Sequence, residues 1–540
     1  MYKSSLRNLD DRVACSNVTM ARVALAVLLV AVAVAPPADA LRILGIFPIQ
    51  ARSHNIMFKG TLHALVDSGH EVVDLSPYPL KTPRSNYTDV DLSKVLPSLV
   101  NTMNFEELTA LTRVGLYDLI RQNVGAELCR KVFQTKQFQD IMSGAYGKFD
   151  VVFTEIVGTD CFSVVAHKMQ VPLISIATQP DFSQIHERMG SVDNPSYLVT
   201  TYEALTGRMN LWQRCRNVFA YFSNIFLVKW WFEYPSDIVL REFFGEDTPP
   251  ISELIKNTSL VMVNRHVSIN PARPSNPNVI EVAGIHIREK PNVSNIPPAI
   301  RKWMDEAEHG VVYFSLGSLV RSDTLPKSSV RALLAAFAAL PQRVLWKYED
   351  SSLELPPNVR IAAWLPQSDV LAHPKVMVFM THGGLMGTSE ALSLGVPMIG
   401  IPVFADQGPN ILQYEELGIA RLLDHRDISK ETVLAAIREF TTSNKYRERA
   451  REVAALYADR PRTAAQEVVW WTEYVVRHKG ARHLRPLSAD LPLHQYLLLD
   501  VIAVFLAAVV TVLAVVSTVL KKVLRIVSAT QPPRSKAKTQ

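Results

Sequence analysis

The sequence contains few cysteines, and its central part has no excess of charge of either sign. Cys15 lies in a leader segment described below, and Cys129, Cys161 and Cys215 are the only other cysteines among the 540 residues. Three remaining cysteines, an odd number, argue against a disulfide framework or a zinc site. Residues 41–520 carry 47 basic and 48 acidic side chains, which excludes an extended basic surface for nucleic acid.

The N-terminal apolar run is too short to cross a bilayer comfortably. Arg22 precedes 13 uncharged residues at 23–35, and Ala38-Asp39-Ala40 follows, a pattern typical of a cleaved secretory signal. We therefore expect residues 1–40 to be a signal peptide. Met20 stands directly before the run, so residues 1–19 are either part of it or an extension from an upstream start. An uncleaved anchor is the alternative interpretation.

The C-terminal apolar run is long enough to span a membrane. Residues 501–520 contain no charge, and we expect a transmembrane helix at 497–520. The basic tail 521–540 indicates the cytosolic side, so the sequence predicts a single-pass type I protein with a luminal body. Lys536 and Lys538 resemble a dilysine retrieval signal and favour the endoplasmic-reticulum membrane, although lysines in a basic tail also arise by chance. Luminal glycosylation is compatible with three sequons, at Asn86, Asn257 and Asn292.

Strand and helix patterns alternate twice along the body. We expect strands at 42–47, 71–75, 149–154 and 173–176, and again at 311–315, 343–347, 376–380 and 398–401. A stretch rich in proline and asparagine at 270–298 reads as a linker. The pattern predicts an α/β protein with two Rossmann-like, doubly wound domains, at 41–285 and 286–490. Ligands are expected in the cleft between them, at the carboxyl ends of the strands.

A glycine-rich turn follows the strand at 376–380. It reads Thr381-His-Gly-Gly-Leu-Met-Gly-Thr388, and a helix is expected from about Ser389. Glycines let the backbone approach a bulky anion, and the start of a helix favours phosphate. His382 can donate to a diphosphate, Glu390 can accept from ribose hydroxyls, and Asp406 with Gln407 from sugar hydroxyls. The alternative is a loop that serves strand–helix packing alone.

The segment FMTHGGLMGTSEALSLGVPMIGIPVFADQ, from Phe379 through Gln407, resembles the signature of the UDP-glycosyltransferase family. The resemblance implies a two-domain fold of the GT-B type, with the UDP-sugar in the C-terminal half and the acceptor in the N-terminal half. It implies an inverting reaction without a metal ion, and the donor motif contains no DxD-type cluster. Upstream, AAWLPQSDVLAHP and FSLGS resemble family segments that contact the nucleoside and the phosphate. The implied donor-binding residues are Ser318, Trp364, Gln367, His382, Gly384, Gly387, Thr388, Glu390, Asp406 and Gln407.

The expected acceptor side contains a candidate general base. His54 lies in the loop after the first strand and resembles the base position of the family; a histidine suits this role near neutral pH. A surface-loop histidine is the alternative. The family pairs this base with an aspartate, but this sequence has Glu155 at the end of the strand and Asp160 five residues later. We expect one of them to be the partner, and Asp160 can instead be a helix N-cap.

The aromatic segment 218–234 has three interpretations: the wall of an apolar acceptor pocket, a membrane-surface segment, or a core helix. We predict transfer of a hexose from UDP-sugar to a hydroxyl of a small lipophilic acceptor. Glucose is favoured because the resemblance is closest to invertebrate members. A membrane-lipid acceptor, a UDP-glucuronate donor and ligand binding without turnover are the alternatives. No cofactor is expected beyond the UDP-sugar co-substrate, and whether the chain forms a homo-oligomer stays open.

Overall fold

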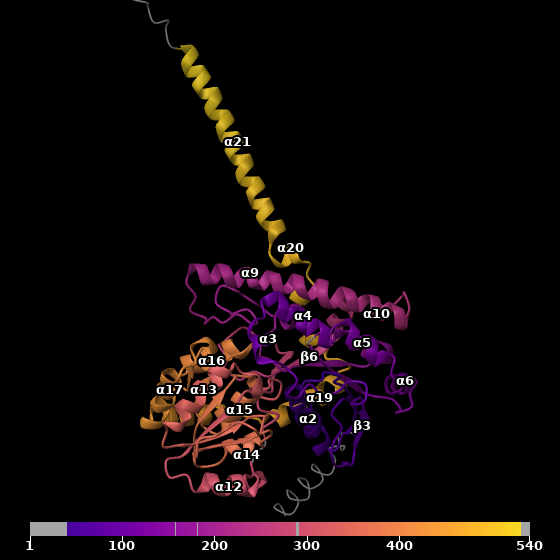
Figure 1. Cartoon of the computed structure of the whole chain (residues 1–540). Coiled ribbons are helices and arrows are strands. Elements are labelled where there is room, and N and C mark those ends of the chain that lie inside the picture. Colours follow the sequence, from indigo (N-terminus) through magenta and orange to yellow (C-terminus); the bar gives the residue numbers. More distant parts are fainter. Residues whose placement is uncertain (1–39, 157, 181, 288–290, 531–540) are drawn as a thin grey trace, which may run out of the picture.

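The computed structural model describes residues 40–530 except 157, 181 and 288–290. Residues 1–39 of the expected signal peptide, and Lys536 and Lys538, lie outside the described residues. Two α/β bodies lie side by side, and one long helix projects away from them (Figure 1).

The N-terminal sheet has seven strands in the order β3-β2-β1-β4-β5-β6-β7, and every pair is parallel. The strands are β1 (Arg42–Ile46), β2 (Glu71–Ser76), β3 (Tyr87–Asp91), β4 (Val151–Glu155), β5 (Leu173–Ala177), β6 (Thr258–Val263) and β7 (Val279–Glu281). Most of these side chains are buried, because helices cover both faces of a parallel sheet. The expectation that 270–298 is only a linker was wrong, since β7 forms the edge of the sheet there.

The C-terminal sheet has six parallel strands in the order β10-β9-β8-β11-β12-β13. They are β8 (Val311–Ser315), β9 (Arg343–Lys347), β10 (Val359–Ala362), β11 (Val376–Thr381), β12 (Met398–Gly400) and β13 (Ala420–Leu422). In each sheet the chain builds outward on one side, then returns to the middle and builds on the other side. The prediction of two doubly wound domains is confirmed.

Helices cover both faces of each sheet. Those of the first body are α2 (Arg52–Asp67), α3 (Phe105–Thr109), α4 (Arg113–Val124), α5 (Ala126–Phe133), α6 (Lys136–Met142), α7 (Ser163–Met169), α8 (Ser183–Met189), α9 (Leu211–Val228), α10 (Tyr234–Phe244) and α11 (Ile251–Leu254). Those that follow are α12 (Pro298–Asp305), α13 (Lys327–Ala338), α14 (Gln367–Leu371), α15 (Leu385–Ser393), α16 (Gln407–Glu416), α17 (Lys430–Thr442), α18 (Lys445–Ala458) and α19 (Ala464–Arg477).

Helix α19 returns from the second body to the first. It packs against α2, and Val468 and Val475 are buried in one apolar cluster with Ile43 of β1. The range 286–490, which the sequence pattern assigns to the second domain, therefore includes a helix that completes the core of the first. This return ties the two bodies together at the far end of the chain.

One disulfide joins Cys129 in α5 to Cys161, in the 3₁₀ turn Asp160–Phe162. The expectation that this sequence holds no disulfide framework needs this correction: three cysteines still allow one bond, and Cys215 is left free and exposed. The bond lies in the core cluster beside Phe133 and Phe162.

The predicted transmembrane segment is a helix, α21 (Leu499–Thr530), and it starts beside the short helix α20 (Leu493–Tyr496). It is 32 residues long, its most apolar window has a mean hydropathy of 2.8, and none of that window is buried against the body. At 1.5 Å per residue it measures about 48 Å, which exceeds the hydrocarbon core of a bilayer. Length and composition therefore allow it to cross a membrane.

Candidate active site

A cavity of about 570 Å³ lies between the two bodies and is lined by residues of both. Its position follows from the topology. In the first sheet the strand order reverses between β1 and β4, and in the second between β8 and β11. At such a reversal the connections leave toward opposite faces and open a crevice beyond the carboxyl ends of the strands. The two crevices face one another across the cavity.

The first crevice holds an imidazole–carboxylate pair. His54 Nδ1 lies 2.6 Å from Oε1 of Glu155, the last residue of β4. Thr178, the first residue after β5, donates its hydroxyl to the same Oε1 at 3.0 Å. Glu155 is fully buried, and its other oxygen has no hydrogen-bond partner. Since Nδ1 faces the carboxylate, Nε2 is the nitrogen of His54 that can exchange a proton in the cavity.

His54 lies in the first turn of α2, which begins at Arg52, and not in the loop after the first strand as expected. The helix thus carries the side chain out of the loop and fixes its direction. Burial lowers the pKa of His54, but the charge and hydrogen bond of Glu155, with the charge of Asp406, raise it by more, so its pKa lies above the ordinary value. A base with a raised pKa holds an abstracted proton more firmly.

Asp160 does not reach His54. Its carboxylate pairs with the buried guanidinium of Arg188, which also donates to Ser175. It does not cap a helix either, since Thr159 occupies the N-cap position and makes no side-chain cap bond. Of the two carboxylates that the sequence offers, the structure brings Glu155 to the histidine and uses Asp160 to neutralise a buried arginine.

The second crevice holds His382, directly after β11. Its ring lies between two glycines: a Cβ on Gly317 would meet the ring at 2.5 Å, and a Cβ on Gly384 would also meet it at 2.5 Å. Burial first, and then the charge of Lys347, lower the pKa of His382 to about 4. The ring is therefore neutral at physiological pH and can donate one N–H, and its Nδ1 has no partner. Its expected hydrogen bond to a diphosphate is thus that of a neutral donor.

The glycine-rich turn is shorter than the sequence suggests. Helix α15 begins at Leu385 and has Gly384 as its N-cap, without a side-chain cap bond. Its first backbone N–H groups therefore point without partners toward the cavity, which Gly384 and Gly387 line. Thr388 is already inside the helix, fully buried, with its hydroxyl bonded to the Gly384 carbonyl and to Tyr414. The helix turns this side chain into the core, and its contact with the donor stays a prediction.

A group of polar side chains from α14 and α15 closes one end of the cavity. Glu390 accepts from Gln367 Nε2 at 2.8 Å and from the Ser368 hydroxyl. These contacts fix the Glu390 carboxylate and leave its remaining lone pairs toward the cavity. Trp364 is half-exposed, and the Arg52 guanidinium of the first body lies 4.8 Å from its ring centroid.

Asp406 and Gln407 stand at the start of α16. Burial raises the pKa of the Asp406 carboxyl, while Asn410, which donates to it at 2.8 Å, and His54 lower it by less. Gln407 Oε1 already accepts the backbone N–H groups of Val403 and Phe404. Gln407 lines the cavity and has its Nε2 left to donate, and its role at the sugar hydroxyls stays a prediction.

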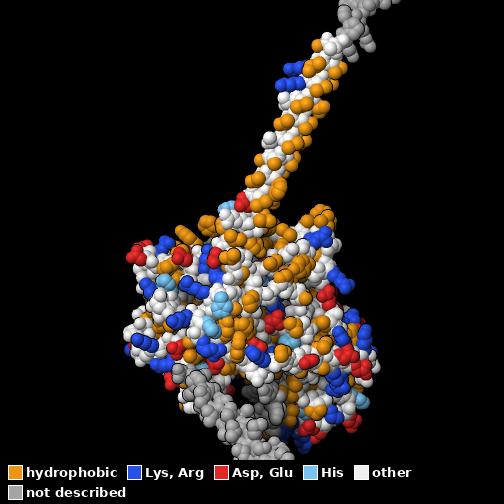
Figure 2. Space-filling view, turned by 180° about the vertical axis from the view of Figure 1, so that it is seen from behind, with side chains coloured by type: hydrophobic (Ala, Val, Ile, Leu, Met, Phe, Trp, Pro, Cys, Tyr) orange, Lys and Arg blue, Asp and Glu red, His pale blue; other side chains and the backbone are white. Residues whose placement is uncertain are grey.

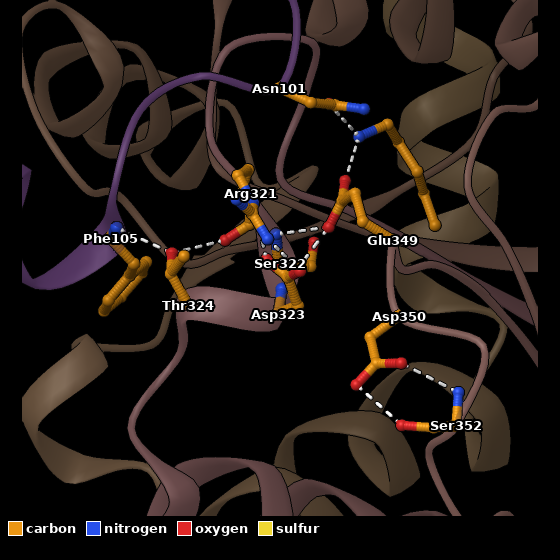
Figure 3. Close-up of polar contacts among 10 residues, drawn as sticks. Asn101, Phe105, Arg321, Ser322, Asp323, Thr324, Glu349, Asp350 and Ser352 are labelled. Carbon is orange, nitrogen blue, oxygen red and sulfur yellow. Dashed lines mark hydrogen bonds and ion pairs between the residues drawn. The ribbon is translucent and has the colours of Figure 1, made fainter.

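The turn that carries Ser318 is held by a strap from the first body, residues 99–105. Asn101 donates its backbone N–H to the Ser318 carbonyl at 2.8 Å, and Arg321 donates its backbone N–H to the Met103 carbonyl at 3.0 Å. Figure 3 shows the side-chain contacts of this strap, including the 2.9 Å bond from the Phe105 backbone to Thr324. Lys347 bridges Asn101 and Glu349, and Glu349 accepts the backbone N–H of Ser322. The turn that carries Ser318 is thus held by residues of both bodies.

The apolar wall of the cavity comes from α4 and the strap. The shared property of these residues is an aliphatic or thioether side chain: Leu99, Met103, Leu116, Leu119, Ile120 and Val124. The sequence pattern does not predict this wall, because an amphipathic helix carries no chemical motif. Ser368, His286 and Thr178 also line the cavity without having been predicted. Of these, Thr178 was detectable, since it follows a predicted strand at the ligand-binding edge.

Comparisons with known proteins agree with this arrangement. The family described as UDP-glucoronosyl and UDP-glucosyl transferase matches residues 42–531. UDP-glucosyltransferase 2 of Dactylopius coccus is 38% identical over 471 residues, covering 86% of this chain and 89% of that protein. UDP-glucuronosyltransferase 2B15 of Rattus norvegicus is 32% identical over 480 residues, covering 85% and 88%.

Solved structures share the fold. A UDP-glucose: anthocyanidin 3-O-glucosyltransferase in complex with UDP superposes with a TM-score of 0.54 at 16% identity, covering 81% of this chain and 99% of that one. A UDP-glucosyltransferase from Polygonum tinctorium gives a TM-score of 0.55 at 16% identity with the same coverage. The two-domain arrangement is that of the GT-B glycosyltransferases.

Proposed function

Because the chain belongs to the UDP-glucoronosyl and UDP-glucosyl transferase family, and is thus a glycosyltransferase that uses a UDP-sugar, we propose that it transfers glucose to a hydroxyl of a small lipophilic acceptor. The anomeric carbon is inverted. His54 is the general base, Glu155 orients it, and the residues around α15 hold the UDP moiety. The observation that carries the proposal is the His54–Glu155 pair, which faces the glycine-rich turn across one cavity.

The reaction follows from this geometry. The acceptor lies against the apolar wall with its hydroxyl beside Nε2 of His54. As the hydroxyl oxygen forms a bond to the anomeric carbon, its proton passes to Nε2, and the bond from that carbon to the UDP oxygen breaks on the opposite side. Attack opposite to the leaving group inverts the carbon. The imidazolium formed is stabilised by the Glu155 carboxylate.

The second body stabilises the negative charge that develops on UDP. The partnerless N–H groups at the start of α15 point toward it, and the neutral His382 ring can donate one further hydrogen bond. Dipoles that are already oriented in the site stabilise such charge without reorganisation. The proposed roles of Trp364 and Gln367 at uracil, of Glu390 at ribose and of Asp406 at the sugar hydroxyls complete the donor site.

Glucose is preferred over glucuronate on two grounds. Among the described residues that line the cavity, Arg52 is the only arginine or lysine, and its guanidinium lies over Trp364, at the nucleoside end. A glucuronate carboxylate would therefore lack a cation beside it. The relative with 38% identity is named a UDP-glucosyltransferase.

The test is a competition between donors. The full-length protein in detergent is given equal UDP-glucose and UDP-glucuronate with a mixture of phenolic and steroid acceptors, and the products are weighed by mass spectrometry. We expect hexose adducts. Adducts that carry a carboxylate would overturn the sugar assignment, and UDP release without any adduct would overturn acceptor transfer.

For location, we propose a luminal body anchored by α21 in the endoplasmic-reticulum membrane. The exposed apolar part of α21, residues 501–520 without a charge, supports the anchor, and the basic residues after Leu520 support a cytosolic side. Asn86, Asn257 and Asn292 are all exposed, as luminal glycosylation requires.

A further inference from the structure

Helices α9 and α10 form one continuous rod with an uncovered apolar face. A π-helical turn at Lys229–Glu233 joins them, so the rod runs from Leu211 to Phe244 and measures about 50 Å. Exposed residues recur at every third or fourth position and share an apolar side chain: Trp212, Cys215, Phe219, Phe222, Phe226, Trp230, Tyr234 and Ile238. Trp212 is 79% exposed and Phe219 is 76% exposed. This spacing places them in one stripe along the rod.

The opposite face of the rod packs on the body. Asn217, Ala220, Asn224, Val228 and Phe232 are buried. The interpretation of segment 218–234 as a core helix therefore holds for one face only. The main cavity is lined by α4, not by this rod, so the rod is not the wall of that cavity. The outer stripe needs a separate explanation, because six aromatic side chains on the surface are costly in water.

The exposed charges beside the stripe have one sign. From Leu211 to Ile238 the exposed charged residues are Arg214, Arg216 and Lys229, all basic, whereas Glu233 and Asp237 are partly covered. Asp237 is turned toward the body, where it accepts the backbone N–H of Ile251. An apolar stripe with tryptophan and tyrosine, bordered by cations, matches the interface of a bilayer that contains anionic lipid.

The rod lies at the base of the anchor. Figure 1 shows α9 and α10 across the end of the body from which α20 and α21 project. The segment that precedes α20 and α21 is held at this end of the body. Ser488 donates to the Gly190 carbonyl at 2.8 Å, and Arg485 donates to the Arg188 carbonyl, both at the end of helix α8. Helix α8 in turn contacts α9. Figure 2 shows apolar side chains gathered on this end of the body around the base of α21.

We propose that the outer stripe of α9–α10 lies in the headgroup region of the same bilayer that α21 spans. The span alone would leave the body free to tilt, whereas a rod in the membrane plane fixes its orientation. Burying six aromatic side chains and Ile238 in the interface stabilises this contact beyond what the three cations contribute. The inference rests on the proposed anchoring by α21.

Cys215 allows a direct test, because it lies in the stripe and is the free cysteine among the described residues. The full-length protein, with Cys15 replaced by serine, is labelled there with an environment-sensitive fluorophore and reconstituted in vesicles of phosphatidylcholine and phosphatidylserine. Two matched labels, on a Cys215→Ser background, are placed by Ala299→Cys and Val509→Cys. Ala299 is exposed on α12, at the opposite end of the body, and Val509 lies within α21.

We expect nitroxide-labelled lipid to quench the Cys215 probe and aqueous iodide to spare it. Iodide should quench the Ala299→Cys probe, and lipid the Val509→Cys probe. The exposed double change Phe222→Asp/Phe226→Asp should return the Cys215 probe to iodide. A Cys215 probe that responds to iodide as the Ala299→Cys probe does, while Val509→Cys stays in lipid, overturns the inference and leaves the anchor intact.

Two other outcomes also count against it. If neither quencher reaches Cys215, another copy of the chain covers the stripe, and crosslinking between Cys215 residues would show this. If iodide reaches Val509→Cys, the anchoring proposal fails and the inference fails with it. Turnover with UDP-glucose, measured on the same vesicles, tests the proposed activity separately.

Discussion

Nδ1 of His54 and Oε1 of Glu155 lie 2.6 Å apart, although 101 residues separate them in the chain. They meet because β1 and β4 are neighbours in the sheet, with Ile46 opposite Thr154. The last residue of β4 and the first turn of α2, the helix that follows β1, thus reach the same crevice. The Glu155 side chain reaches the imidazole directly from the strand.

Replacing His54, the proposed base, should slow turnover strongly without loss of UDP binding. We expect His54→Ala to lower kcat by about 10²–10⁴ and leave UDP affinity unchanged, since the UDP-binding groups lie on the other body. Glu155→Gln should lower kcat in the wild type, but add little on the His54→Ala background, because the pair acts as one unit. Single-turnover kinetics and calorimetry with UDP measure both. Full turnover of His54→Ala on several acceptors would show that the base lies elsewhere.

The pH profile should depend on Glu155. His54 acts only when neutral, and its pKa is raised above the ordinary value, so activity should fall as the pH drops through that raised pKa. In Glu155→Gln the main raising influence is lost while burial, which lowers the pKa, remains. The acid limb of kcat should therefore move to lower pH, with a smaller plateau. An unchanged acid limb would assign it to another group.

Asp160 should matter for stability rather than for catalysis. Asp160→Asn removes the carboxylate that pairs with the buried Arg188 guanidinium. We expect this loss to lower the free energy of unfolding by about 3–5 kcal/mol. Denaturant unfolding measures the loss. The acid limb of kcat should keep its position in the folded variant, and a shift like that of Glu155→Gln would contradict this division of roles.

The glycines around His382 should be intolerant of a methyl group. Gly384→Ala would place a Cβ 2.5 Å from the imidazole and displace it, so we expect UDP affinity to fall by at least the value of one hydrogen bond, about 1 kcal/mol. Gly408→Ala is the matched control in the neighbouring helix α16, where the new Cβ meets Ala204 at 3.5 Å, an ordinary contact. Calorimetry should show UDP binding of the control unchanged. Equal losses in both variants would point to general instability.

The disulfide should contribute measurably to stability. Changing Cys129 and Cys161 together to alanine opens a loop of sequence separation 32, and we expect a loss of about 2–4 kcal/mol. Thermal unfolding compares this variant with Cys215→Ser, whose exposed side chain makes no such bond and whose Tm should match the wild type. If both variants melt like the wild type, the bond does not form in the protein.

The body should be independent of its anchor. Because the apolar window of α21 is not buried against the body, truncation before Leu497 should yield a secreted and active enzyme that loses mass on treatment with an N-glycosidase. Cell fractionation, gel shift and UDP release are the measurements. A truncated product that stays in the cytosol without glycans would contradict the signal peptide at 1–40.

Local sequence determined much of this protein. Runs of β-branched residues and their turn signals located eight of the strands, since a strand buried on both faces of a parallel sheet must be apolar along its length. The sequence pattern pointed to the glycine-rich turn, His382 and Glu390, which all line the cavity, because a phosphate or ribose site constrains residue types over a short stretch. The apolar run before the basic tail likewise predicted the apolar part of α21, because a charged side chain is costly in the hydrocarbon core of a bilayer.

The tertiary structure decided what depends on distant segments. Which carboxylate contacts His54 depends on the order of the strands and on Arg188, which forms an ion pair with Asp160. The partners of Gln407 and the inward turn of Thr388 depend on where α15 and α16 begin, within a few residues that propensity does not resolve. The apolar wall on α4 and the outward stripe of α9–α10 have the same kind of sequence pattern, an amphipathic helix. Only packing decides which apolar face meets a cavity and which stays on the surface, because burial is a property of the assembled chain and not of the segment.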